Sequence, residues 1–210
     1  MKVELLTHSS IRITSNSGVI YTDPYNIRDA AHDAAYIFVT HNHYDHFSPE
    51  DIQKVANDNT VLFVPETMKK QVLKSAVGNL HTESVKPGTC HASGSVEYET
   101  IPAYNILKPF HIRGAGWLGY VLCVDGKRIY IAGDTDLTKE AKEVKCDIAL
   151  IPIGGTYTMD AKKAAELVNQ LRPAIAIPTH YGSVVGNEED AYAFKKAVSE
   201  SIKVEIIKQY

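Results

Sequence analysis

Short β-rich runs open the chain at residues 3–6, 11–14 and 19–22, separated by Ser, Asn and Gly turn residues. This pattern predicts a meander of three strands. A compact apolar run at 35–40 predicts a fourth strand, which leads straight into a cluster of histidines. A helix is expected at 49–56, because Ser48 suits the N-cap and proline is favoured at the first helical position. The histidine cluster therefore lies on a loop between a buried strand and a helix.

Further along the chain, strands give way to helices in each half. Ala, Val and Leu recur at helical spacing over 161–171 before Pro173 stops the helix. Two sheets packed together, with helices on their outer faces, are the expected α/β architecture. The remaining expected elements are strands at 61–64, 96–102, 174–178 and 204–207, a strand pair over 117–132 with a turn at Asp125-Gly126, and helices at 66–75, 137–142 and 188–199.

The two halves of the chain show a weak internal similarity. Residues 11–23, followed by the strand at 35–40, resemble residues 120–134, followed by 147–153. In both halves a hairpin ends on an aspartate, and the next strand delivers a loop. Hairpins with glycine turns are common, so duplication and coincidence both stay open.

Length and charge restrict the classes of function. The chain of 210 residues fits one layered α/β domain, and no linker or low-complexity stretch divides it, so we expect a single domain over 1–210. Its net charge of −3 comes from interspersed acidic and basic residues, which argues against nucleic acid as a partner. We find no apolar run long enough for a secretion signal or a membrane span, and we expect a cytoplasmic protein.

Four potential metal ligands lie within six residues: His41, His43, Asp45 and His46. Imidazoles and a carboxylate crowded on a loop from a buried strand cost desolvation and repulsion unless a cation binds them. A solvated polar loop is the alternative. Spacing by two lets His41 and His43 reach one cation, while Asp45 and His46, further round the turn, reach a second.

The spacing His41-x-His43-x-Asp45-His46 resembles the signature of the metallo-β-lactamase superfamily. The resemblance extends over nearly the whole chain and implies a four-layered αββα sandwich with its site along one edge of the two sheets. The other landmarks of the family follow in order: Thr22-Asp23-Pro24, Gly133-Asp134-Thr135 and Pro178-Thr179-His180.

The resemblance also implies a role for each matching residue. His41 and His43 would bind one divalent metal, with Asp134 shared between it and a second metal, and Asp23 would orient the cluster by hydrogen bonds. The second metal would take Asp45, His46 and His180, and Asp45 and Asp134 are the expected catalytic carboxylates. Zn2+ is the expected cofactor, one or two per chain, with Mn2+ or Fe2+ as alternatives.

The implied reaction is hydrolysis of an ester, lactone, phosphoester or similar bond of a small molecule by a metal-bound hydroxide. The branch closest in appearance includes sugar-phosphate lactonases and phospholipase-D-like proteins. A redox role like that of the diiron flavoproteins is less favoured, because that branch has glutamate where His43 stands. The alternative from a different class is a metal-binding regulatory or structural protein without turnover.

One landmark departs from the family pattern. Where the family places a third histidine for the first metal, this chain has Asn105, whose neutral oxygen is a poorer zinc ligand than imidazole. Either that metal is weakly held, or His111 folds back to supply the third nitrogen. His111 lining the cleft or lying in solvent is equally compatible with the sequence.

Three further residues have two interpretations each. His8 resembles a position where several branches carry a histidine facing the site, but histidines are also common in hairpin turns. Tyr181 either places its phenol near a developing oxyanion or is a buried core residue. Asp136 either assists Asp134 or caps the helix expected at 137–142.

Overall fold

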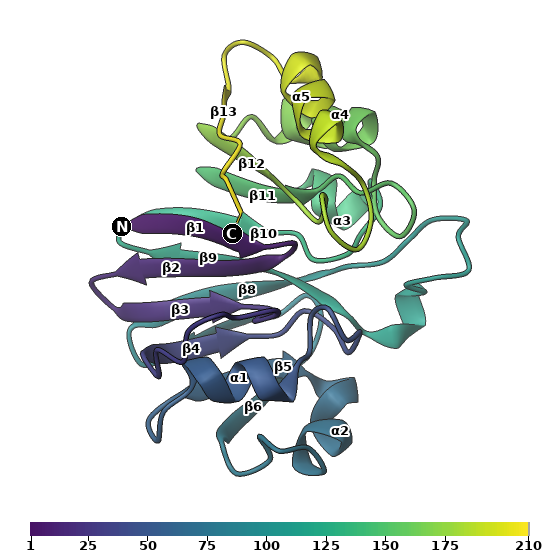
Figure 1. Cartoon of the computed structure of the whole chain (residues 1–210). Helices are drawn as coiled ribbons and strands as arrows, with labels where there is room; N and C mark the ends of the chain where they lie inside the picture. The colour runs from purple at the N-terminus through teal and green to yellow at the C-terminus, as the bar shows by residue number, and fades with distance from the viewer. Residues whose placement is uncertain (210) are drawn as a thin grey trace.

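The computed structural model describes residues 1–209, which form two mixed sheets packed face to face (Figure 1). The first sheet has six strands in the order β1-β2-β3-β4-β5-β6. Their bounds are β1 Lys2–Thr7, β2 Ser10–Ser15, β3 Gly18–Thr22, β4 Ala34–Phe38, β5 Val61–Pro65 and β6 His81–Val85.

The second sheet has seven strands in the order β13-β12-β11-β10-β9-β8-β7. Their bounds are β7 Cys90–Ser93, β8 Val96–Pro102, β9 Leu118–Val124, β10 Lys127–Ile131, β11 Ile148–Pro152, β12 Ile175–Thr179 and β13 Lys203–Val204. The helices are α1 Pro49–Val55, α2 Lys69–Leu73, α3 Lys139–Lys142, α4 Ala161–Leu171 and α5 Glu188–Ala197, with short 3₁₀ helices η1 Glu66–Met68 and η2 Arg113–Ala115.

Both sheets repeat one order of pairing. β2 pairs antiparallel with β3, and β4 then pairs parallel with β3. In the same way β9 pairs antiparallel with β10, and β11 pairs parallel with β10. The internal similarity in the sequence therefore corresponds to equivalent topology, and Asp23 and Asp134 follow equivalent strands.

Local sequence signals explain where the helices begin. The Ser48 side chain accepts a hydrogen bond from the Asp51 N–H, and Pro49 is the first residue of α1, as predicted. Asp160 caps α4, whose Ala164, Ala165, Leu167 and Val168 are buried. These contacts fix the helices on the outer faces of the sheets.

Some expectations about elements were wrong. The helix expected at 66–75 is a 3₁₀ turn followed by the five-residue α2, and the strands β6 and β7 were not predicted. Asp136 does not cap α3, because Thr138 is the N-cap and accepts from the Ala141 N–H. Asp136 instead pairs with Lys108 at 2.7 Å and accepts from the Ile106 N–H.

Aromatic and aliphatic side chains fill the space between the sheets. Phe38 and Phe63 of the first sheet stack at 4.4 Å, and Tyr98 and Tyr120 of the second sheet meet Phe38 edge-on. Rings in such arrangements add to the stabilisation that burial provides. This packing holds the two sheets together behind the edge where the polar loops gather.

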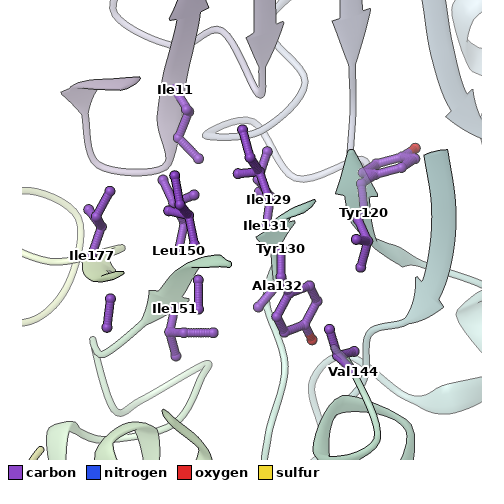
Figure 2. Packing of buried hydrophobic residues seen from close by; sticks show 14 of the residues in the cluster. Ile11, Tyr120, Ile129, Tyr130, Ile131, Ala132, Val144, Leu150, Ile151 and Ile177 are labelled. Carbon is purple, nitrogen blue, oxygen red and sulfur yellow. The ribbon is translucent and has the colours of Figure 1, made fainter. Parts of the chain in front are cut away.

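Side chains along the strands of the second sheet alternate between its two faces, and those of both faces belong to one hydrophobic cluster. Figure 2 shows Ile11 of the first sheet pointing toward Leu150, while Ile151 and Tyr130 point to the opposite side, where Val144 lies. A second cluster joins the outer face of the first sheet to α1 and α2. Four layers follow, helices, sheet, sheet and helices, which confirms the predicted αββα architecture. Among residues 1–209, no helix combines the length and apolarity that crossing a membrane requires.

Candidate metal centre

Six loops bring the predicted site residues together at one edge of the sandwich. They follow the carboxyl ends of β1, β3, β4, β8, β10 and β12. In the first sheet, β1, β3 and β4 run in the same direction, because two antiparallel pairs join β1 to β3 and β4 is parallel to β3. In the second sheet, β8, β10 and β12 run in the same direction for the same reason: two antiparallel pairs join β8 to β10, and parallel pairs join β10 to β12. The residues delivered there are His8, Asp23, the cluster 41–46, His111, Asp134 and His180.

Asp23 and Thr40 organise the histidine cluster from behind. Asp23 is buried, and its carboxylate accepts from the Thr40 backbone N–H at 2.8 Å and from the Thr40 hydroxyl at 2.6 Å. His46 Nδ1 lies 2.7 Å from the same carboxylate, and His41 Nδ1 lies 3.0 Å from Thr40 Oγ1. Since the Nδ1 atoms of both histidines are engaged, each ring directs Nε2 into the site. The predicted orienting role of Asp23 agrees with these contacts.

The first group of potential ligands comprises His41, His43, His111 and Asp134, whose ligand atoms lie within 4.8 Å of one another. His41 Nε2 and His43 Nδ1 are 3.1 Å apart. Two Zn–N bonds of about 2.0 Å at a tetrahedral angle place the nitrogens about 3.3 Å apart. The spacing of these two nitrogens therefore suits a single cation.

The second group comprises His46, Asp134 and His180, and a third comprises His8, Asp45 and His180. The Asp134 carboxylate belongs to both the first and the second group. Its Oδ2 lies 3.1 Å from His180 Nε2 and 3.6 Å from His111 Nε2, and its Oδ1 lies 3.4 Å from His46 Nε2. Asp45 Oδ2 lies 3.4 Å from His8 Nε2 and 3.7 Å from His180 Nε2.

Several buried polar atoms at this edge lack hydrogen-bond partners. Both ring nitrogens of His8, His111 and His180 are buried and unpartnered, as are His46 Nε2 and Asp134 Oδ1. Each such atom costs about 1–3 kcal/mol of unmet desolvation. A divalent cation accepts lone pairs from nitrogen and oxygen together, so this donor set fits a metal.

Backbone strain concentrates on the same residues. His8, Asp23, His111 and His180 have φ values of 49°, 48°, 55° and 57°. Non-glycine residues adopt this left-handed region rarely, and at a cost, and such conformations gather at functional sites. Next to Asp134, Gly133 has φ +63°, and a Cβ there would lie 2.7 Å from the Leu118 carbonyl oxygen, so this turn requires glycine.

Burial shifts the ionisation of most of the imidazoles in one direction. Burial lowers the pKa of His8 and of His111 to about 4, and it holds the pKa of His41 well below its usual value. For His46, burial opposes the charge, but the carboxylates of Asp134 and Asp23 raise its pKa to about 9. Without a cation, burial therefore favours neutral imidazoles at His8, His41 and His111, whereas the carboxylates favour a protonated His46.

These shifts predict acid sensitivity of the metal-free protein. In the unfolded chain His8 and His111 take up protons below about pH 6.5, whereas the folded state keeps them neutral down to about pH 4. Their contribution to stability is complete above pH 6.5 and falls as the pH drops toward 4. We expect urea unfolding of the metal-free protein to show a few kcal/mol less stability at pH 5 than at pH 7. For His8→Gln, the free energies of unfolding at pH 5 and pH 7 should differ less. Equal pH dependence of stability in both proteins would contradict the lowered pKa of His8.

The structure places His111 in the first group, with its ring 5.0 Å from that of His41 and 4.7 Å from that of His43. The Asn105 side-chain amide donates to the Tyr157 carbonyl at 2.7 Å, and its backbone N–H donates to the His111 carbonyl at 2.7 Å. The loop after β8 therefore closes so that His111 reaches the position beside His41 and His43. Tyr181 is 3% exposed and belongs to the main hydrophobic cluster, in keeping with a core residue.

Three contributors to this edge were missed in the sequence. Thr40 carries the hydrogen-bond network, and its place at the end of a strand just before His41 is a usable signal. Trp117 packs its ring 4.9 Å from each of His41, His43 and His111. Gln209 accepts from the His8 N–H at 2.6 Å and donates to the Tyr181 carbonyl at 3.3 Å, a contact that sequence distance hides.

Known proteins with similar sequences and folds agree with this arrangement. A β-lactamase superfamily domain matches residues 2–180. The chain belongs to the β-lactamase superfamily. A metal-dependent hydrolase of Methanosphaera stadtmanae is 30% identical, with 96% of this chain and 93% of the relative covered.

Solved structures place the chain in the same family. A protein of Parabacteroides distasonis described as a metal-dependent hydrolase superposes with a TM-score of 0.85 at 31% identity, covering 99% of this chain and 93% of that one. A metallo-β-lactamase fold protein of Bacillus subtilis has a TM-score of 0.74 at 10% identity, covering 97% and 89%, which supports the fold alone. The chain is thus a metallo-β-lactamase fold member of a family of metal-dependent hydrolases.

Proposed function

We propose that this hydrolase binds two divalent metals, with zinc as the first choice, and cleaves an ester, lactone, phosphoester or similar bond of a small molecule. The observation that carries the proposal is the Asp134 carboxylate, which faces unpartnered imidazole nitrogens of both groups. Its Oδ2 lies 3.1 Å from His180 Nε2 and 3.6 Å from His111 Nε2, and its Oδ1 lies 3.4 Å from His46 Nε2. A carboxylate with both oxygens facing potential ligands can be shared by two neighbouring cations.

Each metal would have its own protein ligands besides Asp134. The first would take His41, His43 and His111, so that His111 supplies the nitrogen that Asn105 cannot. The second would take Asp45, His46 and His180. When bound, the two cations acidify water and polarise the oxygen of a scissile carbonyl or phosphoryl group.

The chain's own residues prepare this site in three ways. Asp23 and Thr40 fix the tautomers and ring directions of His41 and His46. Asp134 brings negative charge to the centre of the histidines, and burial of the surrounding rings excludes water. His8 contacts Asp45, and its backbone carbonyl accepts from the His180 N–H at 2.9 Å, so it holds ligands of the second metal in place.

Trp117 allows metal binding to be observed directly. It is the single tryptophan of the chain, and its ring lies 4.9 Å from three proposed ligands of the first metal. We expect Co2+ added to the metal-free protein to quench most of the tryptophan fluorescence, because a paramagnetic ion in near contact deactivates the excited indole. Zn2+ should leave the emission largely intact and prevent later quenching by Co2+. Unchanged emission, together with elemental analysis that finds no metal after reconstitution, would rule out the proposed centre.

Turnover is tested by a screen of lactones, carboxylic esters, thioesters and phosphodiesters with the zinc-loaded protein. The matched control is Asp134→Asn, which keeps the size of the side chain and removes its charge. Hydrolysis by the natural sequence that the variant loses supports the proposal. Metal binding without hydrolysis in any class would favour the alternative of a regulatory or structural metal protein.

A further inference from the structure

Exposed apolar side chains concentrate beside the metal centre. Among residues 1–209, eight large hydrophobic side chains are exposed, and five of them lie in the loop after β8 or within the histidine cluster. Leu107 is fully exposed, and Tyr44 is 64% exposed. Exposed apolar surface gathered in one place marks a binding surface. We call these five residues the apolar rim: Tyr44, Ile106, Leu107, Phe110 and Ile112.

Three rim residues are chain neighbours of proposed ligands of the first metal. Tyr44 follows His43, while Phe110 and Ile112 flank His111, and the rings of His43 and His111 are 4.7 Å apart. Aromatic neighbours support the rim on both sides. Phe110 meets Tyr157 edge-on at 5.1 Å, and Tyr44 meets Tyr25 edge-on at 5.9 Å.

Burial of the ligands indicates the side from which a substrate approaches. His41, His46, His111 and His180 are buried, and Asp45 and Asp134 are 6% and 3% exposed. His43 is half-buried and therefore opens the centre toward solvent. Tyr44 follows His43 in the chain, and the His111 ring lies 4.7 Å from the His43 ring, so the rim is the apolar surface next to this partly exposed ligand.

The cations of the rim loop are already engaged in ion pairs. Lys108 Nζ lies 2.7 Å from Asp136 Oδ1 and donates to the Thr158 carbonyl at 2.7 Å. Asp136 is only 4% exposed, so removing Lys108 from it would leave a buried charge unpaired, which is costly. Arg113 pairs with Glu140 at 2.8 Å. A phosphate or carboxylate group on the substrate would have to share either cation of this loop with a carboxylate of the protein.

We propose that the apolar rim binds an uncharged alkyl or aryl group of the substrate, so that the enzyme hydrolyses neutral apolar esters, lactones or thioesters rather than sugar phosphates or other anionic compounds. This inference rests on the proposed metal centre, which would hold the bond to be cleaved. The other occupant of such a surface is a second copy of the chain. The substrate is favoured because the rim is continuous with His43 and His111 and borders the opening to the metals.

A series of hydroxamates distinguishes the contribution of the tail to affinity from that of the metal contact. Every hydroxamate presents the same chelating head to the metal, so affinity differences within a series report on the tail. With the zinc-loaded protein we expect calorimetry to show hexanohydroxamate binding about ten- to a hundredfold more tightly than acetohydroxamate. Full burial of one methylene is worth about fourfold, and the four extra methylenes are only partly buried on an open rim. Benzohydroxamate should also gain, whereas glutaric acid monohydroxamate, with its charged tail, should not.

A variant pair assigns the gain to the rim. Phe110→Ala should remove most of the advantage of the pentyl tail of hexanohydroxamate and of the phenyl tail of benzohydroxamate, while leaving acetohydroxamate unchanged. Tyr192→Ala, which removes an exposed aromatic ring from α5, should leave all affinities unchanged.

Each other outcome counts against the inference. Equal affinity for all tails would overturn the rim's role but keep the metal centre, whereas no binding by any hydroxamate would contradict both. If light scattering shows a dimer that Phe110→Ala dissociates, and the tail preference survives in the monomer, the rim is an interface between copies and the inference is wrong.

Discussion

Replacing His111 by alanine is expected to release one of the two metals and to lower hydrolysis by at least about 100-fold. Loss of a residue that merely orients a ligand typically costs 10–100-fold in metal affinity, and a direct ligand costs more. His111 Nε2 lies 3.6 Å from Asp134 Oδ2, and both its ring nitrogens are buried without a partner. Elemental analysis after dialysis, together with Co2+ quenching of Trp117, measures the loss at the first metal.

Asn105→Ala is the matched control for His111→Ala. It removes the hydrogen bond to the Tyr157 carbonyl, worth about 1 kcal/mol of stability, but keeps the backbone bond to His111. Metal occupancy should therefore stay near that of the natural sequence. If Asn105→Ala empties the site while His111→Ala does not, the third ligand has been assigned to the wrong residue. Asn105→His raising occupancy would likewise show that the first metal is only weakly held in the natural protein.

Asp134→Asn is expected to have the largest effect on both metals at once. The amide lacks the negative charge that faces His46 and His180, and it offers one neutral oxygen in place of a carboxylate. We expect hydrolysis to fall by about 10³-fold or more, which corresponds to about 4 kcal/mol of transition-state stabilisation. Metal titration should show that affinity drops at both positions.

His180→Ala provides the contrast for Asp134→Asn. His180 lies 3.1 Å from Asp134 and 3.7 Å from Asp45, and it is absent from the group around His43. Its loss should weaken the second metal and leave quenching of Trp117 by the first largely intact. Equal loss from both positions in His180→Ala would show that the two metals do not divide the ligands as proposed.

Local sequence determined much of the fold and the nucleus of the site. Alternating apolar positions predicted most strands, and Ser48-Pro49 predicted the start of α1, because capping and periodicity depend on residues only a few positions apart. The four potential ligands over 41–46 indicated a metal, because they too lie within a few positions of one another in the sequence. The elements that failed carried weak local signals: β7 has largely exposed side chains, and α2 is a single short turn of helix.

Only the tertiary structure decided how distant residues complete the site. The sequence left Asn105 and His111 as open alternatives, and the closure of the loop after β8 through the backbone bond between them brings His111 to the histidine cluster. His8 and His180, 172 positions apart, approach within 4.0 Å between ring centroids because β1 and β12 end at the same edge. Hydrophobic periodicity reports which face of a strand is buried, but not which strand ends meet, since this depends on the packing of the two sheets.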